Sequence, residues 1–139
     1  MNFMFLGAAV CLMAAGSLAM TMDQLRNLAK MPRSMCIQKT GVNKDLVDKI
    51  QVGEFPEDPK LKCYMKCAMG MMQLLKNGKY SPEAAISQTD KMMPDELKER
   101  FKVVIEKCKE KATGADVCED AFQIVRCNYE QDKEAFFFP

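Results

Sequence analysis

The chain has 139 residues, which suits a single domain, and its 20 basic and 19 acidic side chains give a formal net charge of +1. Because both signs are scattered along the sequence, no basic stripe favours nucleic acid and no polybasic segment favours an anionic membrane. The chain has no histidine, and its serines, cysteines and carboxylates form no familiar catalytic motif. We therefore expect neither an enzyme nor a cofactor.

The N-terminal segment is apolar. No charged side chain precedes Asp23, and residues 4–15 form an apolar run. Small residues, Ser17 and Ala19, then occupy the −3 and −1 positions of a cleavage site after Ala19. This pattern is typical of a secretory signal peptide at 1–19, which leaves a mature domain at 20–139. A membrane anchor is the alternative, but the run is shorter than the roughly 20 apolar residues that a spanning helix needs. The sequence thus predicts a secreted protein without stable membrane insertion.

The mature part is predicted to be all-α. Apolar residues recur at helical spacing throughout residues 20–139, with Gly, Pro and Asn between the helical segments. Residues 21–24 have the form of a capping box and begin a first helix, which Pro32 breaks or kinks. Asn43 caps a short second helix, and residues 53–59 form a loop.

A third, unusually apolar helix follows that loop. Asp58 can cap it and Pro59 suits its first helical position. The helix is predicted to run to about Lys76 and to end at the Asn77–Gly78 pair, because both residues tolerate the left-handed conformation that ends helices.

Three further helices complete the predicted domain. Ser81 and Pro82 repeat the cap-plus-proline start for a short fourth helix, and Pro94 begins a fifth. Gly114 ends the fifth helix, and Asp116 caps a sixth. The sequence contains no internal repeat and no low-complexity linker.

Cysteine usage indicates disulfide bonds. Of the seven cysteines, Cys11 lies in the predicted signal peptide, and an even number remains. In an oxidising compartment six cysteines in a short chain form a disulfide framework, for which about 15 connectivities exist. A zinc site is the alternative, but without histidine it needs four cysteines, and the spacing offers no C-x-x-C pair. We therefore expect disulfides and no metal.

The cysteine order resembles the six-cysteine pattern of the insect odorant-binding and pheromone-binding proteins. The gaps between successive cysteines from Cys36 to Cys127 are 26, 3, 40, 9 and 8 residues. Residues 36–42 (CIQKTGV), residues 60–67 (KLKCYMKC) and the aromatic tail that follows Cys127 are also similar to segments of that family. The likeness covers the whole of residues 20–139.

This resemblance implies a fold and a function. The implied fold is a six-helix bundle around an internal apolar cavity, with the pairs Cys36–Cys67, Cys63–Cys118 and Cys108–Cys127. The implied function is a carrier that binds an odorant or pheromone in sensory lymph and delivers it to an olfactory receptor, as a monomer or weak homodimer. A carrier of hydrophobic ligands or lipids in another secreted fluid stays open, as does a saposin-like lipid-interacting protein, although saposin cysteines are spaced differently.

Two groups of apolar residues are candidate cavity walls. The chain has 13 methionines and no tryptophan, and flexible thioethers can repack around ligands of different shape. We expect four methionines of the third helix and of the segment just before the fifth to form a deformable cavity wall, and these are Met65, Met69, Met72 and Met93. Ordinary filling of the core is the alternative. The resemblance implies further wall positions, although a core face would show the same periodicity: Ile86, Leu97, Phe101, Val104, Ile105, Phe122 and Val125.

The end of the chain carries the remaining candidates. Asn128 would supply a hydrogen-bonding group if it points inward, and an exposed asparagine is the alternative. Three consecutive phenylalanines near a terminus would be costly to expose, since burying each one contributes about 1.5–3 kcal/mol. We expect these residues to fold inward as a lid over the cavity, with a frayed terminus as the alternative: Phe136, Phe137 and Phe138.

Overall fold

The computed structural model describes residues 20–139, so the predicted signal peptide at 1–19 lies outside the described residues. The described part contains six α-helices, one two-stranded antiparallel hairpin and one turn of 3-10 helix, which confirms the all-α class. The elements are α1 (Met22–Thr40), α2 (Lys44–Ile50), α3 (Pro59–Met71), β1 (Leu75–Lys76), β2 (Lys79–Tyr80), α4 (Pro82–Met92), α5 (Asp95–Cys108), η1 (Lys109–Lys111) and α6 (Val117–Gln131).

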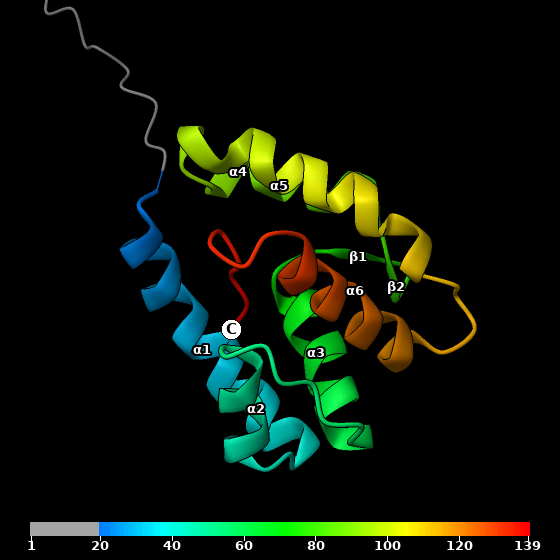
Figure 1. The fold of residues 1–139 in the computed structure, drawn as a ribbon. Helices are drawn as coiled ribbons and strands as arrows, with labels where there is room; N and C mark the ends of the chain where they lie inside the picture. Colours follow the sequence, from blue (N-terminus) through cyan, green and yellow to red (C-terminus); the bar gives the residue numbers. More distant parts are fainter. Residues whose placement is uncertain (1–19) are drawn as a thin grey trace, which may run out of the picture.

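The helices are arranged around a central pair. α3 and α6 pack side by side in the middle of the molecule, and α1 packs against α3 (Figure 1). α4 and α5 pair with each other and form a separate layer above that centre (Figure 1). Residues 132–139, the C-terminal tail, turn back from α6 and run into the space between α1 and the central pair (Figure 1).

Polar caps begin most of the helices where the sequence predicts them. Thr21 Oγ1 accepts a hydrogen bond from the Gln24 backbone N–H at 3.2 Å, and Gln24 Oε1 accepts one from the Thr21 N–H at 2.9 Å, which completes a capping box. These bonds satisfy N–H groups that have no partner inside the helix. Side chains also cap α2, α3, α4 and α6, and these caps are Asn43, Asp58, Ser81 and Asp116.

Of the two effects expected of Pro32, a break or a kink, the break is wrong. α1 continues through Pro32 to Thr40 and ends at Gly41, whose φ of +66° is left-handed and whose N–H bonds the Ile37 carbonyl at 2.9 Å. Proline removes one helical hydrogen bond, but Pro32 and Cys36 are both buried on the face of α1 that meets the rest of the molecule. Packing and the disulfide at Cys36 therefore hold the helix together across the proline.

The predicted end of the third helix is also wrong. α3 ends at Met71, and Gln73 follows with a left-handed φ of 60°. The chain then forms the β1–β2 hairpin, in which Asn77 and Gly78 occupy the turn with φ of 52° and 76°. An Asn-Gly pair with two positive φ values is the preferred two-residue hairpin turn. The residues interpreted as a helix end thus reverse a strand.

Three disulfides tie the helices to one another. Their Cα–Cα distances are 5.7, 4.6 and 5.8 Å, within the normal range for a disulfide. The first joins α1 to α3, the second joins α3 to the start of α6, and the third joins the end of α5 to α6. The pairs are those that the family resemblance implies: Cys36–Cys67, Cys63–Cys118 and Cys108–Cys127.

The best-packed part of the molecule lies between α3 and α6, and we call it the core region. Phe122 is fully buried there, with the ring of Phe55 edge-on at a centroid distance of 6.2 Å and the ammonium of Lys62 5.0 Å from its centroid. Other side chains of this region with no exposed surface are Leu61, Tyr64, Met65, Ala68 and Val125. No helix of residues 20–139 is long and apolar enough to cross a membrane.

Candidate ligand-binding cavity

A large cavity lies on the other side of the central pair, bordered by α1, the end of α3, α4, α5, α6 and the tail. Its volume is about 360 Å³, within the range found for sites that enclose small molecules. α1 contributes several adjacent apolar residues to its wall, including Leu25, Leu28, Ala29 and Pro32. We call this space the larger cavity.

Methionine forms much of the wall. Three of the predicted methionines, Met69, Met72 and Met93, line the larger cavity. Further methionines at its surface are Met31, Met71 and Met92. Because an unbranched thioether has three rotatable bonds, such a wall can adapt to ligands of different outline.

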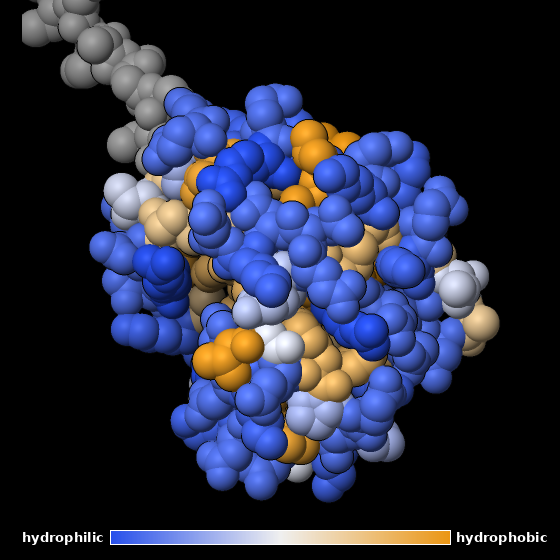
Figure 2. Space-filling view, viewed as in Figure 1, coloured by the Kyte–Doolittle hydropathy of each residue, from blue (hydrophilic) through white to orange (hydrophobic). Residues whose placement is uncertain are grey.

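The larger cavity opens to solvent beside α1. Three of its lining residues are substantially exposed, with Leu28 at 54%, Met31 at 64% and Met71 at 37%. In the space-filling view, apolar side chains are visible in a recess beside α1 and hydrophilic side chains surround that recess (Figure 2). An apolar molecule therefore has a route to the cavity between α1 and the end of α3.

The side chains that line the larger cavity carry no charge. Among residues 20–139, those that line it include no Asp, Glu, Lys or Arg. Two of its polar side chains bond to each other, since the Gln88 amide donates to Gln73 Oε1 at 3.3 Å. The Thr89 hydroxyl donates to the Ala85 carbonyl at 2.9 Å. An anionic ligand would lose its hydration here without a cationic side chain to replace it.

Tyr80 of β2 also lines this cavity. Burial raises the pKa of its phenol to about 12, because a phenolate would be poorly solvated among apolar side chains. The phenol therefore stays neutral at physiological pH and adds no charge to the wall.

The C-terminal tail closes one side of the larger cavity. Phe137, Phe138 and Pro139 line it, so the end of the chain is packed against the domain and is not frayed. The Gln51 side-chain N–H donates to the Phe138 carbonyl at 2.9 Å, and the buried Tyr64 hydroxyl donates to the main-chain oxygen of Pro139 at 2.8 Å. Tyr64 of the core region and Gln51, which directly follows α2, thus hold the end of the tail in place.

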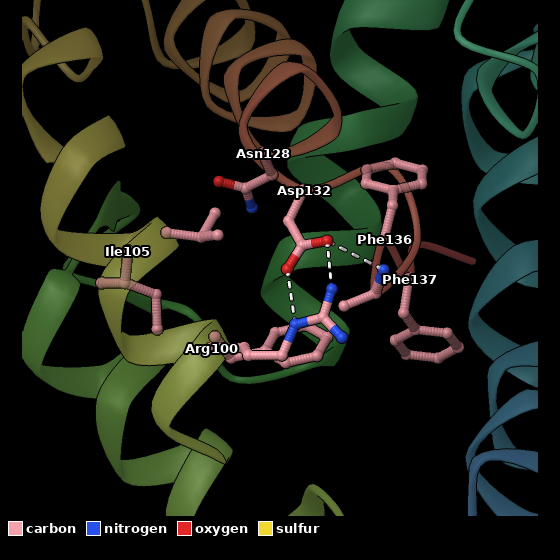
Figure 3. Close-up of a pocket in the computed structure, with 9 residues that line it drawn as sticks. Arg100, Ile105, Asn128, Asp132, Phe136 and Phe137 are labelled. Atoms are coloured by element: carbon pink, nitrogen blue, oxygen red, sulfur yellow. Dashed lines mark hydrogen bonds and ion pairs between the residues drawn. The ribbon is translucent and has the colours of Figure 1, made fainter. Parts of the chain in front are cut away.

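An ion pair fixes the start of the tail. Arg100 of α5 donates two hydrogen bonds to Asp132, from Nε to Oδ2 at 2.9 Å and from Nη2 to Oδ1 at 2.6 Å (Figure 3). The Ala135 N–H donates to the same carboxylate at 3.2 Å. The bond from Arg100 holds the pKa of Asp132 below its usual value, since both partners favour the charged form. The tail is therefore tied to α5 as long as this carboxylate is ionised.

A smaller cavity of about 30 Å³ lies between α5, α6 and the tail, next to this ion pair. It is lined in part by the predicted residues Val104 and Phe136. Four residues border both cavities, and these are Phe101, Ile105, Asn128 and Phe137. The two spaces are thus neighbours separated by a few side chains.

Asn128 points inward. Its side-chain oxygen is buried and has no hydrogen-bond partner among the described residues. In the close-up, its amide extends from α6 toward α5, on the same side as Ile105 (Figure 3). The alternative of an exposed asparagine is wrong. A buried polar group without a partner costs about 1–3 kcal/mol, so this amide is an unusual feature of an apolar wall.

The structure separates the remaining predicted residues from the cavities. Met65, Phe122 and Val125 are fully buried in the core region, and Ile86 and Leu97 are half-buried outside both cavities. Sequence reasoning missed the contribution of α1, although its apolar residues recur at helical spacing on one face. That spacing showed a buried face but not what the face meets.

Comparisons with known proteins agree with this architecture. A sequence model of the PBP/GOBP family matches residues 18–131 of the chain. General odorant-binding protein 72 of Anopheles gambiae is 33% identical over 122 residues, which cover 87% of this chain and 100% of that relative.

Two solved structures are similar over almost their whole length. Odorant binding protein 5 of Apis mellifera matches with a TM-score of 0.80 and 36% identity, covering 88% of this chain and 100% of that one. Odorant binding protein 4 of Chrysopa pallens matches with a TM-score of 0.79 and 34% identity, covering 86% and 99%. The similarity therefore covers most of this chain.

Proposed function

Because the chain belongs to the PBP/GOBP family, we propose that it is a secreted carrier that holds a small, neutral, apolar molecule in the larger cavity. The observation that carries this proposal is a cavity of about 360 Å³ whose lining side chains bear no formal charge. An enclosed apolar wall takes up apolar molecules from water because their contact removes apolar surface from the solvent.

We propose the predicted residues that border this cavity as ligand contacts. They come from the end of α3, the α4–α5 junction, α5, α6 and the tail, and they are Met69, Met72, Met93, Phe101, Ile105, Asn128, Phe137 and Phe138. To these we add Leu25, Leu28 and Pro32 of α1. The phenylalanines of the tail act in this proposal as the lid, since they cover one side of the space.

The proposed function also includes secretion of the protein and delivery of its ligand. Residues 1–19 direct secretion as a signal peptide, and the mature protein acts as a monomer or weak homodimer in sensory lymph and passes its ligand to an olfactory receptor. Transport without chemical change is in keeping with relatives named for odorant binding and with the absence of histidine from the sequence.

Fluorescent displacement tests the carrier function. The protein, secreted from eukaryotic cells with its disulfides formed, is titrated with N-phenyl-1-naphthylamine, and aliphatic odorants then compete for the site. A ligand that buries roughly 400 Å² of apolar surface gains about 10 kcal/mol before association costs, so we expect dissociation constants near 1 μM, or about 8 kcal/mol. The proposal fails if neither the dye nor any competitor binds below about 100 μM.

Native mass spectrometry of the protein purified from its source tissue tests the remaining parts. The mass of the polypeptide identifies the N-terminus and the number of disulfides, and the mass of the complex identifies a retained ligand and the oligomeric state. A mature chain that still carries residues 1–19 would contradict secretion through a cleaved signal peptide.

A further inference from the structure

Three of the polar side chains at the surface of the larger cavity have partners within the protein. Gln73 and Gln88 bond to each other, and Thr89 bonds to a backbone carbonyl of its own helix. Such groups offer little to a ligand, because a new hydrogen bond would first have to replace an existing one.

Asn128 differs from them. Its Oδ1 is buried without a partner, and none of the hydrogen bonds within residues 20–139 involves its side-chain amide. The same side chain borders both the larger and the smaller cavity. Its amide oxygen is therefore a buried hydrogen-bond acceptor, on a half-buried side chain, at a surface that a ligand can reach.

We propose that Asn128 binds the polar end of the ligand and that this end is a hydroxyl group. The inference rests on the proposed carrier function and specifies its ligand class as long-chain alcohols. A hydroxyl donates one hydrogen bond and accepts others, so it pairs with Oδ1 and can also accept from Nδ2. An ether or ester oxygen only accepts, and it leaves Oδ1 without a donor.

The charges around Asn128 disfavour the other common lipid head group, a carboxylate. Arg100 is the cation that borders the smaller cavity, and its guanidinium is engaged by both oxygens of Asp132. The larger cavity is lined by no cation of residues 20–139. A fatty-acid anion would thus be desolvated without a free positive partner, whereas an alcohol enters neutral.

A pair of isomeric ligands tests the inference. 1-Dodecanol and 1-methoxyundecane contain the same atoms, and only the alcohol can donate a hydrogen bond. Each displaces N-phenyl-1-naphthylamine from the wild-type protein and from Asn128→Leu, whose side chain has nearly the same size without polar atoms. We expect the ratio of alcohol to ether affinity to be about tenfold higher in the wild type than in the variant.

The ether affinity serves as an internal reference, because a general loss of folding weakens both ligands and cancels from the ratio. Asn128→Ala removes the amide without adding bulk and should lower the ratio in the same direction. Gln123→Leu is the matched control, since it removes another amide of α6 from a residue that lines neither cavity and bonds Glu119. Its ratio should equal that of the wild type.

Three outcomes overturn the inference. An equal ratio in the wild type and in both Asn128 variants shows that the amide does not select alcohols, while binding of both ligands leaves the carrier function intact. If Tyr80→Phe changes the ratio of alcohol to ether affinity and Asn128→Leu does not, the ligand hydroxyl binds the phenol of Tyr80 instead. Failure of both ligands to displace the dye from the wild type removes the carrier function and this inference with it.

Discussion

The two sides of the central helix pair are built from the same kinds of residue but differ in what fills the space. In the core region, Tyr64, Met65 and Phe122 have no exposed surface and lie against other side chains. On the other side, Met69, Phe101 and Ile105 border open volume. The comparison shows that an apolar helix face determines which side chains are buried, but not whether they meet other atoms or open space.

The largest expected effect is a difference in the free energy of unfolding between substitutions on the two sides. Phe122→Ala should lower the free energy of unfolding by about 3–5 kcal/mol, because it opens a new void in close-packed surroundings. Phe101→Ala enlarges an existing cavity and should cost less than about half of that. Urea titration followed by circular dichroism measures both values. Equal losses would show that the cavity side is packed as tightly as the core region.

A second substitution probes the edge of the core region. Gly53 has a φ of +78°, and a Cβ at this position would lie 2.2 Å from the ring of Tyr129. Gly53→Ala should therefore destabilise the protein by about 1–3 kcal/mol through overpacking and backbone strain. Thermal melting measures the loss, and Gly78→Ala is the matched control, since no atom lies within 4 Å of its Cβ position although its φ is also positive. If Gly78→Ala costs as much, the contact with Tyr129 is not the cause.

A third prediction concerns the junction of the two sides, where the tail ends. Tyr64→Phe removes the hydroxyl that donates to the main-chain oxygen of Pro139, and it should weaken the hold on the tail by about 1–2 kcal/mol. We expect a dissociation rate of N-phenyl-1-naphthylamine about fivefold to thirtyfold higher, measured by stopped-flow fluorescence, with little change in helical content. An unchanged rate would mean that the tail does not control ligand release.

The smallest expected effect is that of moderate acid. The pKa of Asp132 is lowered by its bond with Arg100, so the pair contributes fully above the ordinary aspartate pKa of about 3.9 and is lost only as the pH falls through the lowered value. With no histidine in the chain, affinity should change less than about twofold between pH 7 and about 5.5. Dye titration at both pH values measures it. A tenfold loss of dye affinity over this interval would show that the Arg100–Asp132 ion pair does not hold the tail in place at pH 5.5.

Much of the fold could be predicted because its signals are local. Asn43, Asp58 and Ser81 cap helices through bonds to residues two or three positions away, and such bonds depend on little beyond the neighbouring sequence. The pair Asn77–Gly78 carried a local signal too, but it suits a helix end and a hairpin turn equally, and only the pairing of β1 with β2 decides between them.

The cavity itself could be predicted only in part. Phe101 and Phe122 both lie at apolar positions of amphipathic helices, yet one borders the cavity and the other fills the core. Helical periodicity reports which side of a helix faces inward, and distances between helices decide whether that side meets atoms or space. For the same reason the wall supplied by Leu25 and Pro32 was visible as an apolar face but not as part of a site.

The positions of the disulfides determine where this molecule can deform. Every disulfide bond ends on α1, α3, α5 or α6. The 40 residues between Cys67 and Cys108 therefore form one long segment that is cross-linked only at its two ends. The hairpin, α4 and most of α5 lie on that segment, and so does much of the wall of the larger cavity. No disulfide ends within this segment, so its motion would break only non-covalent contacts. We therefore expect this part of the cavity wall to change shape more readily than the cross-linked parts of α3 and α6.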